Sequence, residues 1–203
     1  MMRTRSAFAG LIAGLVLAPA ALFGHPFQGS IATLLLEPQS LQTEFMLDLN
    51  ELDKNFAIDA DHNHAVDHGE LNAGLDRVLS YLEKHLQVTV DGARLSLQPF
   101  LENELKERIA ATVPDGGYPE ADYSTVHVGF LFRNPLAARP REVGVELDVF
   151  GEMGQDHLSV AKFVEKLQDG TARQEHIMLS AAHRGHRFVV HPLAAPAAEP
   201  SGL

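Results

Sequence analysis

The residues from Asp59 to Glu70 place oxygen-bearing side chains at nearly every second position. Carboxylates and amides suit hard cations, and Ca²⁺ takes about six to eight oxygen ligands at roughly 2.3–2.6 Å. Four carboxylates inside these twelve residues also repel one another unless a cation lies among them. We therefore predict a calcium-type site, a stabilising one of low affinity. Its predicted ligands are Asp59, Asp61, Asn63, the backbone carbonyl of Ala65, Asp67 and Glu70.

The same twelve residues resemble an EF-hand calcium loop. The resemblance implies that Glu70 closes the shell with both oxygens and that Asp67 binds directly or through water. Val66 provides no ligand and is expected to anchor the loop to the core. At the position of His64 the family has glycine. The reason is that the chain turns there with a positive φ. Such hands usually work in pairs, and the sequence contains no second loop, so we expect a Kd of about 10⁻⁴–10⁻³ M.

Three histidines leave an alternative open. His62, His64 and His68 fall at positions whose side chains point away from a cation held in EF-hand geometry. Imidazole combined with carboxylate suits Ni²⁺, Cu²⁺ or Zn²⁺, so the loop could instead serve a periplasmic transition-metal-binding accessory protein. A further alternative is a purely structural acidic turn in a module that binds a protein partner at the cell envelope.

Two helices are expected to hold this loop. Asn50 is a candidate N-cap that opens a short helix over Glu51–Ile58. After the loop, leucine and valine recur at helical spacing and predict an amphipathic helix packed against a sheet. That apolar stripe consists of Leu71, Leu75, Val78, Leu79, Leu82 and Leu86. A helix-loop-helix insertion is therefore predicted at about residues 50–86.

The remainder of the chain is predicted to be mainly β. Apolar and polar residues alternate over Leu41–Leu49, Val126–Phe132 and Val143–Val149, which is the pattern of strands with one buried face. Many short strands of this kind are typical of an antiparallel β-sandwich. We predict a single β-rich domain over residues 25–191, followed by a disordered tail at residues 192–203 that is rich in alanine and proline.

The first 24 residues are predicted to be a signal peptide, since a short basic start is followed by an apolar run and small residues. No later segment is apolar for long enough to span a bilayer, so we expect an exported protein, periplasmic or secreted. A formal net charge of −11 over 203 residues argues against nucleic acid as a partner. The chain has no cysteine and none of the nucleophile, phosphate-loop or zinc-protease motifs, so no enzyme is predicted.

The order of these segments resembles a known family. His25-Pro26-Phe27, the Leu41–Leu49 strand, the acidic loop, its helix and Val88-Thr89-Val90-Asp91-Gly92 together resemble the extracytoplasmic region of HupE/UreJ-type membrane proteins. The resemblance covers residues 25–190. It implies a role in handling nickel or other metals. Members of that family continue into several membrane helices, which this chain lacks, so the resemblance implies an exported accessory domain.

Overall fold

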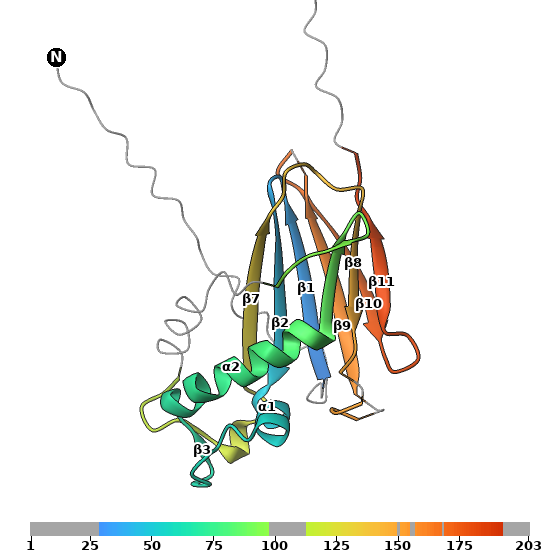
Figure 1. Cartoon of the computed structure of the whole chain (residues 1–203). Coiled ribbons are helices and arrows are strands. Elements are labelled where there is room, and N and C mark those ends of the chain that lie inside the picture. The colour runs from blue at the N-terminus through green and yellow to red at the C-terminus, as the bar shows by residue number, and fades with distance from the viewer. Residues whose placement is uncertain (1–28, 98–112, 150, 155–156, 168, 193–203) are drawn as a thin grey trace, which may run out of the picture.

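The computed structural model describes residues 29–97, 113–149, 151–154, 157–167 and 169–192. The predicted signal peptide lies outside the described residues, and so does the predicted tail apart from Pro192. The first sheet has the strand order β10-β9-β1-β2-β7 (Figure 1). Its strands are β1 (Gly29–Glu37), β2 (Ser40–Asp48), β7 (His127–Pro135), β9 (Leu158–Lys166) and β10 (Ala172–Leu179).

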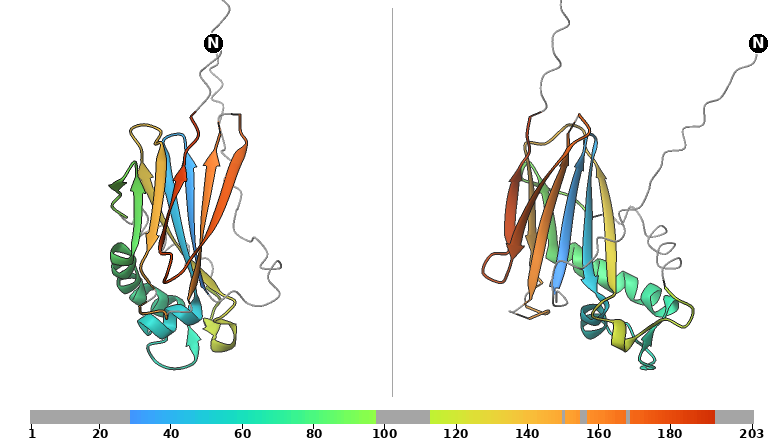
Figure 2. Two further views of the ribbon diagram at one scale, coloured as in Figure 1. Left: turned by 90° about the vertical axis from the view of Figure 1, so that its right-hand side faces the viewer. Right: turned by 180° about the vertical axis from the view of Figure 1, so that it is seen from behind.

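The second sheet has four strands in the order β11-β8-β4-β5 and lies against the first, as the edge-on view in Figure 2 shows. Its strands are β4 (Leu86–Val90), β5 (Ala93–Arg94), β8 (Glu142–Leu147) and β11 (Gly185–Val189). All pairs within it are antiparallel. The predicted fold class, a mainly β sandwich with an inserted helix-loop-helix segment, is confirmed.

One strand pair departs from the antiparallel pattern. β1 and β9 run parallel, with Ser30 opposite Ser159. A parallel pair cannot be closed by a tight turn and needs a long crossover connection. Most of the chain lies between these two strands and supplies that connection.

The alternating strand residues form the core between the sheets. On β1, Leu34 is fully buried, whereas its neighbour Leu35 faces the outer side and is only partly buried. Phe163 of β9 and Phe188 of β11 stack with ring centroids 5.1 Å apart, so this aromatic pair joins the two sheets. Burying such rings contributes about 1.5–3 kcal/mol each relative to leaving them exposed.

A buried charge accompanies this core. Glu165 of β9 is completely buried, and its carboxylate accepts hydrogen bonds from the Arg139 guanidinium at 2.5 Å and the His191 backbone amide at 3.0 Å. Arg173 of β10 also lies 3.8 Å from the same carboxylate. These partners offset part of the desolvation cost of Glu165, which is several kcal/mol, while its Oε2 atom has no hydrogen-bond partner among the described residues.

The helices lie at one end of the sandwich. α1 (Leu49–Phe56) follows β2 directly, and α2 (His68–His85) runs across the strands before β4 begins (Figure 1). The predicted stripe is confirmed for α2, since Leu71, Leu75 and Val78 are buried beside Val128 and Phe130 of β7. Its last member, Leu86, lies outside the helix and begins β4. Among the described residues, neither helix combines the length and the apolar character that a membrane span requires.

The two faces of β1 offer a direct test of this packing. We expect Leu34→Ala to lower the free energy of unfolding by about 2–5 kcal/mol, because it leaves a cavity between the sheets. Leu35→Ala removes the same atoms from the outer face and should cost clearly less. Urea denaturation of both variants checks this expectation. Equal losses would contradict the assigned faces of β1.

Candidate metal centre

Asp48 opens the short helix before the loop. Its side chain accepts a hydrogen bond from the Glu51 amide at 2.7 Å, and its backbone is extended, as expected for an N-cap. The prediction that Asn50 caps this helix is therefore wrong, because α1 already begins at Leu49. Burial raises the pKa of the Asp48 carboxyl, although the hydrogen bond from Glu51 opposes this effect. The helix ends at Phe56, and its C-cap residue Ala57 adopts a left-handed conformation.

Three predicted ligands converge in the loop that follows. Asp59, Asp61 and Glu70 each offer a carboxylate oxygen, and these atoms all lie within 4.8 Å of one another. Two ligands of a cation held at about 2.4 Å can be no more than about 4.8 Å apart, so the spacing fits one ion. Among the described residues, these three carboxylates form the group of His, Asp or Glu side chains that lie close enough together to hold a metal ion.

Backbone amides hold two of these carboxylates in place. Asp59 accepts hydrogen bonds from the amides of Asn63 at 3.2 Å and His64 at 3.0 Å. Glu70 accepts one from Ala60 at 2.9 Å and one from Asp67 at 3.0 Å. Each carboxylate oxygen has two lone pairs, so an oxygen that accepts one amide can still bind a cation. The loop is therefore wrapped around its own carboxylates.

The other predicted ligands lie nearby but outside this group of three. The Asn63 side-chain oxygen accepts from the Ala65 amide at 2.8 Å, and its nitrogen donates to Asp61 at 2.9 Å. Asp67 is the N-cap of α2 and accepts from the Glu70 amide at 2.9 Å, which completes a reciprocal capping box with Glu70. Val66 is fully buried, as expected for the residue that anchors the loop.

The three loop histidines do not join the carboxylate group. His64 has a φ of +66°, so its backbone adopts the left-handed conformation that is expected of the glycine at this position of an EF-hand loop. The His64 ring instead lies 2.8 Å from the Glu120 carboxylate, and both side chains are exposed. His62 also has a positive φ, of +57°, and is exposed. His68 contacts the Asn72 side chain at 3.0 Å.

A segment that the sequence analysis missed pairs with the loop. β3 (Ala65–Val66) forms a small antiparallel sheet with β6 (Tyr118–Pro119). Gly117 has a φ of +80°, and a Cβ atom there would lie 2.7 Å from the Val66 carbonyl oxygen. The close approach therefore requires glycine. In the sequence, the adjacent glycines Gly116-Gly117 indicate a turn at this place. They do not show which segment of the chain packs against that turn.

Tyr123 lies behind the loop and was also missed. Its side chain is 3% exposed, and its hydroxyl has no hydrogen-bond partner among the described residues. Burial raises the pKa of Tyr123 to about 12, and the negative charges of Asp59, Asp53, Glu70 and Glu120 add to this effect. The phenol therefore stays neutral at ordinary pH and remains able to donate a hydrogen bond.

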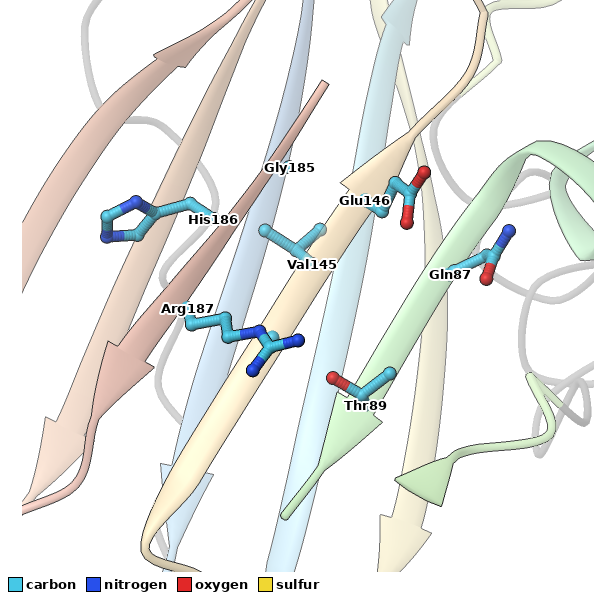
Figure 3. Close-up of a pocket in the computed structure, with 8 residues that line it drawn as sticks. Gln87, Thr89, Val145, Glu146, Gly185, His186 and Arg187 are labelled. Carbon is cyan, nitrogen blue, oxygen red and sulfur yellow. The ribbon is translucent and has the colours of Figure 1, made fainter. Parts of the chain in front are cut away.

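Two other polar features are distinct from the loop. Ser30 lies 3.1 Å from the His157 imidazole and 2.5 Å from the Ser159 hydroxyl, and both serines are fully buried. Residues of β4, β8 and β11 line a trough, among them Thr89, Glu146 and Arg187 (Figure 3). The side chains of Thr89 and Arg187 both lie close to Gly144. The trough shares no residue with the loop.

Known proteins add no further assignment. No family model matches the sequence, and no curated protein matches it either. The resemblances to an EF-hand loop and to HupE/UreJ-type proteins therefore stay predictions. The geometry of the loop carries the functional argument.

The N-cap of α1 can be tested on its own. Asp48→Ala should lower the free energy of unfolding by about 1 kcal/mol, whereas Asp48→Asn keeps an acceptor and should recover most of this loss.

The pKa of Asp48 is raised in the folded state, so the folded protein holds this proton more tightly than the unfolded chain. Wild type should therefore gain stability relative to Asp48→Asn as pH falls toward 4. Urea titrations at pH 7 and pH 4 measure both differences, and a relative loss at pH 4 would contradict this sign.

Proposed function

We propose that this protein is an exported calcium-binding protein whose single EF-hand-like loop holds a structural ion of low affinity. The observation that carries the proposal is the convergence of Asp59, Asp61 and Glu70 within 4.8 Å. Asn63, the Ala65 carbonyl and Asp67 complete the proposed ligand set, either directly or through water. The export of the protein rests on the basic and apolar start of the sequence.

Charge and ligand type both support calcium. Three carboxylates at this spacing repel one another. A bound divalent cation attracts each of them and so offsets that repulsion. The donor set consists of oxygen atoms, which calcium prefers, whereas zinc, copper and nickel favour sites that include imidazole nitrogen. The loop is also largely exposed, since Asp61, Asn63 and Asp67 are on the surface. Exposure favours the weaker class of site, with a Kd of about 10⁻⁴–10⁻³ M.

Calcium should stabilise the folded protein measurably. With a Kd of about 1 mM, about 10 mM Ca²⁺ should add roughly 1.4 kcal/mol to the free energy of unfolding. For a domain of this size the melting temperature should then rise by about 3–6 °C. Differential scanning calorimetry with and without Ca²⁺ measures the rise, and its absence in the wild-type protein would rule out calcium.

Glu70→Gln provides the matched test of the site. Glutamine can still accept the Asp67 amide and so keeps the capping box of α2, but it removes the charge and the bidentate carboxylate. We expect this variant to fold and to lose the calcium-dependent rise. Glu83→Gln makes the same chemical change at an exposed position later on α2 and should leave the rise intact. An unchanged rise in Glu70→Gln would place the ion elsewhere.

A metal series separates calcium from the transition-metal alternative. Isothermal titration calorimetry with Ca²⁺, Ni²⁺, Cu²⁺ and Zn²⁺ on wild type and on a His62/His64/His68→Ala variant distinguishes the calcium site from the transition-metal site. We expect calcium binding to survive the triple substitution, because the three imidazoles lie outside the carboxylate group. Strong Ni²⁺, Cu²⁺ or Zn²⁺ binding that the variant loses would favour the alternative instead.

A further inference from the structure

The residues Gly117–Val126, which we call the partner segment, lie between the loop and the first turn of α1. At one end, β6 pairs with β3 of the loop. At the other end, the Leu49 amide donates to the Val126 carbonyl at 2.8 Å, and the Asn50 amide donates to the Tyr123 carbonyl at 3.3 Å. The first amides of a helix have no acceptor within the helix itself. The partner segment therefore supplies acceptors for the N-terminus of α1.

A short chain of hydrogen bonds connects the carboxylates to this segment through one residue. The His64 amide donates to the Asp59 carboxylate at 3.0 Å, and the His64 carbonyl accepts from the Glu120 amide at 2.9 Å. Any movement of Asp59 that shifts His64 must therefore disturb Glu120 as well. Such a contiguous network can carry energetic coupling between two places in a protein.

Tyr123 makes a second connection, between the partner segment and α1. Its amide donates to the Glu120 carbonyl at 3.2 Å, and its carbonyl accepts from the Asn50 amide at 3.3 Å. Its side chain is buried, with 3% of it exposed. The turn that contacts His64 is therefore joined to the first turn of α1.

We propose that cation binding in the loop and docking of the partner segment are one coupled event, in which His64 is a positioning residue that joins the Asp59 carboxylate to the Glu120 amide. This inference rests on the proposed calcium function and names the part of the protein that the ion controls. When the loop is empty, repulsion among Asp59, Asp61 and Glu70 weakens the His64 connection, and the segment opens more often. By linkage, a docked segment strengthens cation binding by the same factor.

Hydrogen exchange followed by mass spectrometry tests the coupling on the wild-type protein. With about 10 mM Ca²⁺, exchange of the Glu120, Leu49 and Asn50 amides should slow by about tenfold, within the usual range of coupling factors. Amides of β9 and β10, which lie away from the loop, serve as the internal reference. Calcium binding seen by calorimetry without added protection at Gly117–Val126 would overturn this inference and leave the proposed function standing. Absence of any calcium binding would instead remove the proposed function, and this inference with it.

Gly117→Ala perturbs docking from the other side. The added Cβ would meet the Val66 carbonyl oxygen at 2.7 Å, so β6 must move away from β3. We expect the core of the sandwich to remain folded, because Gly117 lies outside both large sheets. Calcium affinity should fall by about tenfold. Affinity equal to that of wild type in a folded variant would contradict the coupling.

Discussion

Mutual repulsion among Asp59, Asp61 and Glu70 is the constraint on which the design of this end of the protein depends. Their oxygens lie within 4.8 Å of one another, a spacing that like charges resist. Backbone amides of Ala60, Asn63 and His64 offset part of that repulsion, and these amides come from the same loop. The loop thus uses its own peptide groups to hold its acidic side chains together. A cation bound among them would offset the repulsion that remains.

The sandwich provides a rigid base for this arrangement. α1 follows β2 without an intervening loop, and α2 leads directly into β4. Each helix is therefore continuous with a strand of a different sheet, and the loop between them is fixed at both ends. Buried Val66 and Ile58 add apolar anchors within the loop region. A site built on such supports keeps its geometry better than one on a free surface loop.

The parts that sequence predicted are those governed by local periodicity. Alternation along Leu41–Leu49 located β2, and the leucine stripe located α2, because burial of one face repeats with the period of the element. The position of the cap was missed by two residues, since both Asp48 and Asn50 are good N-caps and only tertiary contacts choose between them. The pairing of β3 with β6 and the parallel pairing of β1 with β9 join residues far apart in the chain. No local pattern encodes such contacts, and Tyr123 was missed for the same reason.

The place of β1 in the first sheet has a consequence for how the chain acquires its structure. β1 lies between β2 and β9, and its partner residues on β9 run from Leu158 to Glu165. One edge of β1 therefore stays unpaired until the segment Leu158–Glu165, far along the chain, is available to pair with it. Contacts of such long sequence separation slow folding, since loop closure must precede the contacts that compensate it. We expect the first sheet to form late and in a concerted manner, because β10 pairs with β9 and β9 must first pair with β1.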